Sequence, residues 1–351
     1  MVEYPRIIHT SDLHLNENKP ETIDALEKIL QLAKDLEVDL VTIAGDIFHT
    51  IEDAEALRPT LRSKLSNLDY EIIAIPGNHD LESYTGNLNF GSSLTLATEG
   101  PYQVFKRKDT SIVAVPYVDR PDEKLLRQLR EEADKAESSV LLLHCTLDIG
   151  CKAEDFGEEH AHYFPISMGV IESLGFDHVL AGHFHRTPQL RKIKDKGYFV
   201  YPGSPVSLSK SEVGKRSVVL FHDWEKPVSV PLASFYYDAI EFFVSPDEEE
   251  HLVAEIKEWY SARCEDNCSL SVTVDGYTTL DESYLEEQIK QVSEKAEHEI
   301  RFRDVSKVIR HPLYLGFLEK LREKEAKDPE HVKRLVMEVM VRLLSMGEIR
   351  G

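Results

Sequence analysis

Residues 71–80 have the sequence Glu71-Ile72-Ile73-Ala74-Ile75-Pro76-Gly77-Asn78-His79-Asp80. The apolar run that ends at Ile75 predicts a short buried strand, and the polar tetrapeptide Gly77 to Asp80 follows its carboxyl end. In open α/β sheets, ligands bind at that end of the strands. An amide oxygen, an imidazole and a carboxylate on consecutive residues suit metal binding or proton transfer. Taken alone, the tetrapeptide is equally well explained as a turn with a capping aspartate.

Two strand-helix pairs precede this stretch. Residues 7–10 and 39–44 are apolar runs that predict strands, and residues 20–37 and 53–68 carry apolar side chains at helical spacing. Pro20 suits the first turn of the first helix. A chain that alternates strands and helices with short links forms a largely parallel, layered α/β sheet.

Further elements are predicted along the rest of the chain. Strands are expected at 110–115, 139–143, 176–181, 198–201 and 217–221, with a helix at 121–136 and a turn at 202–205. After a change of composition near Pro231, strands at 236–244, 269–274 and 299–302 alternate with helices at 246–262 and 282–296. Helices at 313–327 and 329–345 follow, the second capped by Asp328. We expect three parts: residues 1–233, a β-α-β-α-β domain at 234–310 and a helical pair at 311–351.

The composition is that of a globular protein with an acidic surface. Hydrophobic residues make up 42% of 351 positions, and no segment has the character of a signal peptide or a membrane span. Four cysteines without zinc-site spacing predict reduced thiols and a cytoplasmic protein. Cys145, beside His144, is expected to be a buried thiol and not a nucleophile. The net charge of −22 argues against coating of nucleic acid by simple electrostatics, but not against an enzyme with metal ions in its active face.

Side chains of metal-binding type follow five of the predicted strands. They are Asp12 and His14; Asp46 and His49; Asn78, His79 and Asp80; His144; and His183 and His185. Strands that run the same way in one sheet would bring them to one edge. Each pair alone has a structural explanation, as a capping aspartate or a hydrogen-bonded histidine. His160 and His162 follow no predicted strand and are expected to be surface residues.

Together these side chains offer oxygen and imidazole ligands and no thiolate. Such a set suits manganese, iron or zinc, and its oxygen donors favour manganese, with magnesium as a further alternative. Without His49, His79 and Asp80, the set is two aspartates, one asparagine and four histidines. These seven ligands are too many for one ion, but they suit two ions about 3.5–4 Å apart that share a carboxylate.

The order and spacing of the motifs resemble those of the calcineurin-like metallophosphoesterase superfamily. The matching motifs are Asp12-x-His14, Gly45-Asp46, Gly77-Asn78-His79-Asp80, His144 and Gly182-His183-x-His185. The resemblance implies a layered α/β/β/α sandwich with two metal ions. It assigns one ion to Asp12, His14, Asp46 and His185. It assigns the other to Asp46, Asn78, His144 and His183, so that Asp46 bridges.

The same resemblance implies how a phosphoester is hydrolysed. Two divalent ions against two carboxylates leave a site charge of about +2, which attracts a phosphate anion. A metal lowers the pKa of its bound water to about 7, so hydroxide is available for in-line attack. His79 would serve the leaving oxygen as general acid. Asp80 would hold the tautomer of His79 or would be a plain loop cap; both interpretations remain open.

Longer matches resemble one branch of the superfamily, the SbcD-type DNA repair nucleases, also called meiotic recombination eleven. The matches are residues 8–15, 45–49, 181–186 and 201–205. The likeness covers residues 6–222 and extends more loosely to the β-α-β-α-β domain, which is similar to that family's DNA-capping domain. The sequence departs from the family at Asn16, where Gly is frequent, and in its short segment between Asp46 and Gly77.

This second resemblance implies a manganese-dependent nuclease of DNA double-strand-break repair. It would trim duplex ends from 3′ to 5′ and cut single strands. His49 would assist catalysis, and Arg186, next to a ligand loop, is a weak candidate for DNA contact. The implied partners are DNA, an SbcC-type ATPase with a long coiled coil, and a second copy of the chain in a homodimer. No membrane partner is expected.

Two apolar stripes in the C-terminal helices bear on the ATPase partner. At helical spacing they comprise Val332, Leu335, Val336, Val339, Met340 and Leu343 on the last helix, and Leu315, Leu318 and Leu321 on the helix before it. The stripes either pack against the preceding domain or bind helices of a partner. The sequence leaves both interpretations open.

Two other functions compete with the nuclease. A phosphomonoesterase or cyclic-nucleotide phosphodiesterase would use the same metals on small molecules, but it would not need residues 234–351. A non-enzymatic scaffold with this fold would not need the complete ligand set together with His79.

Overall fold

The computed structural model describes residues 3–79, 81–84, 89–148, 163–222, 224–246, 248–324 and 329–346. The chain divides into two compact units, Met1–Tyr237 and Asp238–Gly351. The expected division into residues 1–233, 234–310 and 311–351 stays a prediction. Within the described ranges, no helix has the length and apolar character that crossing a membrane would require.

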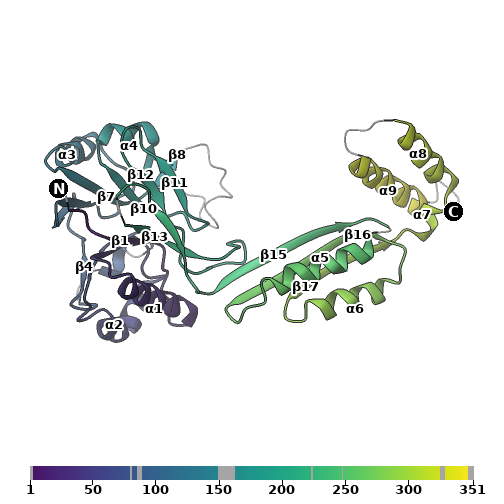
Figure 1. The fold of residues 1–351 in the computed structure, drawn as a ribbon, viewed down its shortest axis with the longest axis horizontal. Coiled ribbons are helices and arrows are strands. Elements are labelled where there is room, and N and C mark those ends of the chain that lie inside the picture. The colour runs from purple at the N-terminus through teal and green to yellow at the C-terminus, as the bar shows by residue number, and fades with distance from the viewer. Residues whose placement is uncertain are drawn as a thin grey trace. The chain divides into compact units, whose positions relative to one another are not determined.

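The first unit contains two six-stranded sheets (Figure 1). The first sheet has the order β14-β13-β1-β2-β3-β4, in which β1 to β4 are parallel and β13 is antiparallel to β1 and β14. Its strands are β1 Ile7–Thr10, β2 Leu40–Ala44, β3 Glu71–Ile75, β4 Leu94–Leu96, β13 Ser217–Phe221 and β14 Val228–Pro231. The sequence does not predict β4 and β14, the two edge strands.

The second sheet has the order β11-β12-β10-β7-β6-β5. Its four inner strands are parallel, and the edge strands β5 and β11 are antiparallel to their neighbours. The bounds are β5 Gln103–Arg107, β6 Thr110–Ala114, β7 Ser138–His144, β10 His178–Gly182, β11 Gln189–Lys192 and β12 Tyr198–Tyr201. A separate short pair, β8 Thr146–Asp148 and β9 Pro165–Ser167, is parallel.

Helices cover the outer face of each sheet, so the first unit has four layers, α/β/β/α (Figure 1). Helices α1 Pro20–Asp35 and α2 Ile51–Lys64 pack on the first sheet, and α3 Glu123–Ala133 and α4 Met168–Leu174 on the second. A third apolar cluster lies between the sheets, where Ile73 of one and Leu142 and Leu180 of the other are fully buried. Each such side chain contributes about 1.5–3 kcal/mol through burial. The layered sandwich expected from the resemblance is confirmed.

Local chemistry explains where the covering helices begin. Thr50, Asp122 and Ser167 cap α2, α3 and α4 by accepting a hydrogen bond from the backbone N–H three residues on. The helix predicted at 53–68 therefore begins earlier, at Ile51, and ends at Lys64. A 3-10 turn, η1 Leu81–Tyr84, comes after the tetrapeptide Gly77 to Asp80 that follows β3.

The second unit is a three-stranded sheet with helices. The sheet order is β15-β16-β17, with β15 Tyr236–Val244, whose first two residues belong to the first unit, β16 Cys268–Thr278 and β17 Glu297–Asp304. Helices α5 Glu249–Ser261 and α6 Glu282–Val292 share an apolar cluster with the sheet. The alternation predicted for residues 236–302 is confirmed. Three helices follow: α7 Ser306–Ile309, α8 Pro312–Glu323 and α9 Pro329–Met346.

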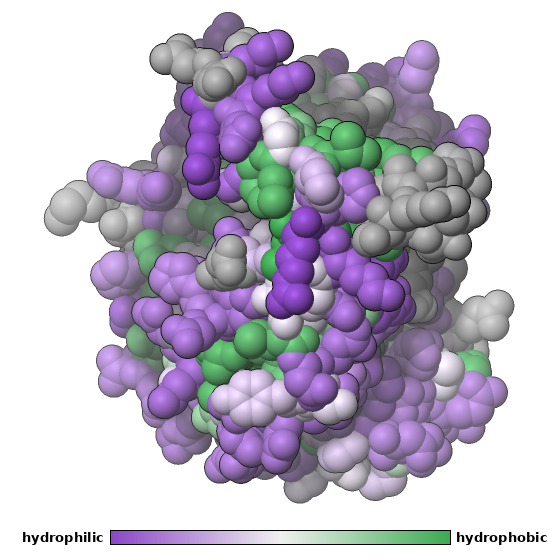
Figure 2. Space-filling view, turned by 90° about the vertical axis from the view of Figure 1, so that its right-hand side faces the viewer, coloured by the Kyte–Doolittle hydropathy of each residue, from purple (hydrophilic) through white to green (hydrophobic). Residues whose placement is uncertain are grey.

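The apolar stripes of α8 and α9 divide between packing and exposure. Met340 of the predicted stripe is buried, together with Met337 of the same helix, in a cluster with Tyr277 and Tyr314. Leu335 and Val339, on another side of the same helix, are 48% and 55% exposed. Figure 2 shows a largely hydrophilic face on which hydrophobic patches lie among polar side chains. Asp328, the predicted cap of the last helix, lies outside the described residues.

Candidate metal centre

The expected site residues come from both sheets and not from one. Asp12 and His14 follow β1, Asp46 and His49 follow β2, and Asn78 and His79 follow β3 in the first sheet; His144 ends β7, and His183 and His185 follow β10 in the second. A hydrogen bond shows that the two sheets lie close together here. The backbone N–H of His183, after β10, donates to both carboxylate oxygens of Asp12, after β1, at 3.1 Å. The expected site residues therefore lie where the edges of two packed sheets come together, and not at the edge of a single sheet as predicted.

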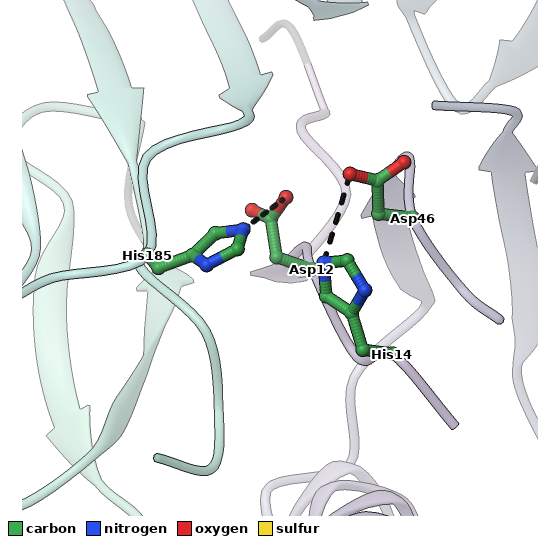
Figure 3. Close-up of side chains that lie close together, drawn as sticks. All are labelled: Asp12, His14, Asp46 and His185. Atoms are coloured by element: carbon green, nitrogen blue, oxygen red, sulfur yellow. Dashed lines mark ion pairs between the residues drawn. The ribbon is translucent and has the colours of Figure 1, made fainter. Parts of the chain in front are cut away.

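One group comprises Asp12, His14, Asp46 and His185. Each offers a ligand atom, and these four atoms all lie within 4.8 Å of one another (Figure 3). His14 Nε2 is 3.7 Å from Asp46 Oδ2, and His185 Nε2 is 3.7 Å from Asp12 Oδ1. All four residues are buried. This is the set that the resemblance assigns to one ion.

A second group surrounds His144. Its Nε2 lies 2.9 Å from Asn78 Oδ1 and 3.4 Å from Asp46 Oδ2, and its ring is 5.2 Å from the ring of His183. Its Nδ1 donates to the carbonyl oxygen of Ala44 at 2.8 Å. A carbonyl oxygen can only accept, so the proton is on Nδ1 and the lone pair of Nε2 points toward Asn78 and Asp46. Asp46 Oδ2 therefore faces both groups.

The backbone around these side chains is strained. Asp12, His14, Asp46 and His183 all have positive φ, between 42° and 104°. Residues other than glycine adopt this region at a cost, and such residues concentrate at functional sites. The four residues with positive φ in one cluster indicate that the fold stabilises an unfavourable backbone conformation, which orients these side chains toward one another.

Two glycines allow the loops to approach. A Cβ at Gly77 would lie 2.0 Å from Asp46 Oδ1, and one at Gly182 would lie 1.9 Å from the carbonyl oxygen of Ala44. Neither the carboxylate of Asp46 nor the backbone at Ala44 could move away from such a Cβ without displacing the cluster. The glycines of the motifs are therefore a packing requirement of the site.

The side chains present fit divalent metal ions. Both ring nitrogens of the buried His14 lack a hydrogen-bond partner among the described residues. Burial, followed by the charge of neighbouring imidazoles such as His185 and His79, lowers the pKa of His14 well below its usual range. A neutral imidazole is the form that binds a metal. Buried lone pairs that converge with two carboxylates are stable together only when a cation lies among them.

Two expected catalytic histidines lie beside the cluster. The ring of His79 is 4.9 Å from that of His14 at 75°, and the ring of His49 is 5.8 Å from His14. His49 and His79 are stacked 6.2 Å apart. The N–H of His79 donates to Asp46 Oδ1 at 3.0 Å, which fixes its loop against the cluster. Asp80, like His160 and His162, lies outside the described residues, so its expected role stays a prediction.

Two other residues considered from the sequence, Arg186 and Cys145, each neighbour a proposed ligand histidine in the chain. Arg186 directly follows His185 and is partly buried. Burial raises the pKa of the Cys145 thiol to about 12, so its side chain is inert, as expected. The three described cysteines are free thiols.

Glu212 is a site residue that the sequence did not indicate. This buried carboxylate lies in the loop before β13, and its Oε1 is 3.2 Å from Nδ1 of His185. Burial alone would raise the pKa of Glu212, but the hydrogen bond from His185 and the charge of Arg216 outweigh burial and lower that pKa. A lone acidic residue in a serine-rich loop has no periodicity or spacing that could have marked it.

The solved structures to which this chain is similar include three of low identity and low TM-score. A dimetal phosphatase from Danio rerio (LOC 393393) has 11% identity and a TM-score of 0.46, covering 66% of this chain and all of its own. GAP50, the anchor in the inner membrane complex of Plasmodium, has 11% identity and a TM-score of 0.42, covering 65% and 84%. Yfce, a phosphoesterase from E. coli, has 14% identity and a TM-score of 0.30, covering 62% and 88%. Likeness at this level carries no information about the substrate.

A family comparison covers the part of the chain that carries the site. The family described as calcineurin-like phosphoesterase matches residues 5–187, just over half of the 351 residues. The matched range includes both sheets' contributions to the cluster, from Asp12 to His185. The chain thus belongs to the calcineurin-like phosphoesterases, and it is a phosphoester hydrolase of metallophosphoesterase type.

Proposed function

We propose that this hydrolase is a DNA nuclease that trims duplex ends from 3′ to 5′ and cuts single strands during double-strand-break repair. The supporting observation is the pair of imidazoles, His49 and His79, which lies beside the metal-ligand cluster and is not part of it. The longer motif matches to SbcD-type nucleases, residues 8–15 and 45–49 among them, support the same substrate.

The chemistry of the leaving group gives these imidazoles their proposed roles. Cleavage of a DNA phosphodiester expels a sugar alkoxide, a poor leaving group unless it receives a proton. His79 is half-buried, and its backbone is tied to Asp46, so its ring has a fixed position at the edge of the cluster. It would donate that proton, a contribution of about 10²–10⁴-fold in rate. His49, stacked against it and exposed, would support the transfer.

The two groups around Asp46 would each hold a divalent ion. Asp12, His14, Asp46 and His185 would bind one, and Asp46, Asn78, His144 and His183 the other. We propose manganese, with Fe²⁺, Zn²⁺ and Mg²⁺ as alternatives. When bound, such ions polarise phosphoryl oxygens and lower the pKa of water. The chain itself holds Asp12 through the N–H of His183 and holds His144 through the carbonyl of Ala44, so the ligand atoms are placed beforehand.

A pocket of about 370 Å³ opens onto the first group. Its lining includes His14, His49, His79, His185 and Lys19. Lys19 is exposed at the start of α1, and its Nζ donates to the carbonyl of Leu208 at 3.3 Å. In a chain with a net charge of −22, this cation on the rim would attract the phosphate next to the one that is cleaved.

The partner in this proposal is an SbcC-type coiled-coil ATPase. The exposed Leu335 and Val339 lie one helical turn apart on α9, and Leu313 and Leu315 of α8 are also largely exposed. Such residues suit binding of a partner's helices. The double substitution Leu335→Glu and Val339→Glu should abolish binding of a purified coiled-coil segment of the ATPase from the same genome, without loss of DNA cleavage. Undiminished binding would contradict this surface as the contact. The homodimer also stays a proposal, which light scattering of the purified chain tests.

Blocked DNA ends test the proposed polarity. Manganese-loaded protein should shorten a 5′-labelled duplex stepwise, and phosphorothioate linkages at the 3′ ends should stop this digestion. The same linkages at the 5′ ends should have no effect. Early release of the 5′ label as a mononucleotide, or protection by 5′ linkages alone, would contradict 3′ to 5′ digestion.

A further inference from the structure

Glu212 is almost completely buried beside the metal centre, with 3% of its surface exposed. Oε1 lies 3.2 Å from Nδ1 of His185. Oε2 accepts hydrogen bonds from the N–H of Leu208 at 2.9 Å and from the hydroxyl of Ser204 at 3.2 Å. Both carboxylate oxygens are therefore engaged, and one of them contacts an expected metal ligand.

The contact determines which nitrogen of His185 carries the proton. An ionised carboxylate has no proton to donate, so His185 must donate from Nδ1 to Glu212. A neutral imidazole with its proton on Nδ1 has its lone pair on Nε2. That atom lies 3.7 Å from Asp12 Oδ1, inside the cluster.

We propose that Glu212 is a positioning residue of the metal centre, which keeps the proton of His185 on Nδ1 and presents Nε2 to the metal. It does for His185 what the carbonyl of Ala44 does for His144. Hydrogen bonds of this kind fix the orientation of metal-binding imidazoles and make them more basic. The inference rests on the metal site of the proposed function and not on DNA as the substrate.

The loop that carries Glu212 is held firmly enough for this role. Arg216, itself buried, donates from its guanidinium to the carbonyl of Ser204 at 3.0 Å and to the carbonyl of His185. The hydroxyl of Ser207 donates to the carbonyl of Glu212 at 2.6 Å. These bonds tie the carboxylate and the loop of His185 into one unit, and the positive charge of Arg216 offsets that of the carboxylate.

Glu212→Gln separates positioning from packing, because it keeps the size of the side chain and removes its charge. If the amide nitrogen faces His185, the proton must move to Nε2, the atom meant for the metal. If the amide oxygen faces His185, the amide nitrogen confronts the N–H of Leu208, and two donors meet. Either orientation disfavours the arrangement that binds metal.

Glu249 provides a matched control in the second unit. It is 5% exposed and accepts hydrogen bonds from the hydroxyl of Thr278 at 3.0 Å and from the N–H of Thr279 at 3.2 Å. It therefore resembles Glu212 in burial and in these two partners but contacts no imidazole in the described structure. Glu249→Gln reports what the loss of a buried carboxylate does to the fold alone.

The first test needs neither metal nor substrate. Long-range ¹H–¹⁵N spectra of the metal-free, ¹⁵N-histidine-labelled full chain identify the protonated nitrogen of each imidazole, with His185 assigned by loss of its signals in His185→Gln. We expect a proton on Nδ1 and none on Nε2 in the wild-type chain. A His185 that carries its proton on Nε2 in the wild type would overturn the proposal, whether or not any variant folds.

The second test measures metal binding directly. In calorimetric titration of chelated protein with Mn²⁺, Glu212→Gln should weaken binding at one of two sites by about 10–100-fold, whereas Glu249→Gln should bind as the wild type does. A folded Glu212→Gln chain that keeps Nδ1 protonated and binds Mn²⁺ within about twofold of wild type would refute the role. If the protein failed to cleave DNA, only the proposed substrate would be wrong. The protonated nitrogen of His185 and the affinity for Mn²⁺ would still test the role of Glu212.

Discussion

His144 Nδ1 lies 2.8 Å from the carbonyl oxygen of Ala44, so a histidine at the end of β7 in the second sheet is held by the end of β2 in the first. The bond spans the interface between the two sheets, and it leaves Nε2 directed toward Asp46 and Asn78. The geometry of the metal centre is thus a property of how the sheets pack.

Because the two sheets approach closely at Gly182, we expect Gly182→Ala to destabilise the fold. The added Cβ would lie 1.9 Å from the carbonyl oxygen of Ala44, the same atom that accepts from His144. We expect a loss of about 1–3 kcal/mol in the free energy of unfolding, measured by urea titration, together with weaker metal binding. Gly316→Ala is the control, because a Cβ on α8 meets nothing within 4 Å and should raise stability by about 0.4–1 kcal/mol. Equal effects of the two substitutions would contradict this packing.

Removal of the His79 imidazole should separate binding from catalysis. His79→Ala leaves the ligand atoms of both groups in place, so Mn²⁺ affinity by calorimetry should stay within about twofold of wild type. The rate of DNA cleavage should fall by about 10²–10⁴-fold, the usual contribution of a general acid. His222→Ala, at an exposed histidine outside the cluster, should keep full activity. Full activity in metal-loaded His79→Ala would refute the proposed role.

The position of Asp46 between the two groups of side chains predicts that both proposed ions would depend on it. Asp46 Oδ2 lies 3.7 Å from His14 Nε2 and 3.4 Å from His144 Nε2, so Asp46→Asn weakens a ligand of each group. Mn²⁺ binding should weaken by more than about 100-fold at both sites. That is more than the loss of a residue that only hydrogen-bonds a metal ligand usually causes. Asp53→Asn alters a buried carboxylate near the start of α2 and should leave both sites intact. Weakening at one site only would contradict the proposal that Asp46 serves both ions.

The buried His9 predicts acid sensitivity of the fold. Burial lowers its pKa from 6.5 to about 4, and it outweighs the hydrogen bonds to Thr42 and to the carbonyl of Ala181, which favour the protonated form. As pH falls from 6.5 toward 4, the unfolded chain takes up a proton that the folded chain excludes, so the free energy of unfolding falls. His9 accounts for about 2 kcal/mol of that loss between pH 7 and pH 5. Urea titration of metal-free His9→Gln should show a correspondingly smaller loss; an unchanged pH dependence would contradict the assignment.

Much of the site could be predicted because its signals are local. A polar residue directly after an apolar run marks the end of a strand, and this identified Asp12, Asp46 and Asn78 without any knowledge of their neighbours. The periodic helices and the alternation in the second unit were predictable for the same reason. Prediction of the element ends was less accurate, since caps such as Thr50 move a helix start by a few residues.

The features that the sequence did not predict depend on contacts between residues far apart in the chain. Nothing in β7 or β10 specifies that they join a second sheet facing the first, so the edge where the residues meet was wrongly assigned to one sheet. Glu212 contacts His185 only because the intervening loop folds back on itself. The edge strands β11 and β14 are short and partly exposed and thus lack a buried apolar run.

The measurement that tests the central claim most directly is cleavage of DNA against cleavage of a small ester. Chelated protein reloaded with Mn²⁺ is given a labelled linear duplex and, separately, a small phosphodiester, with Asp46→Asn as the inactive control. The proposal predicts that the duplex is degraded and that Asp46→Asn abolishes degradation. Hydrolysis of the small ester with an intact duplex would contradict the nuclease, while leaving the metal centre and the phosphoesterase family in place.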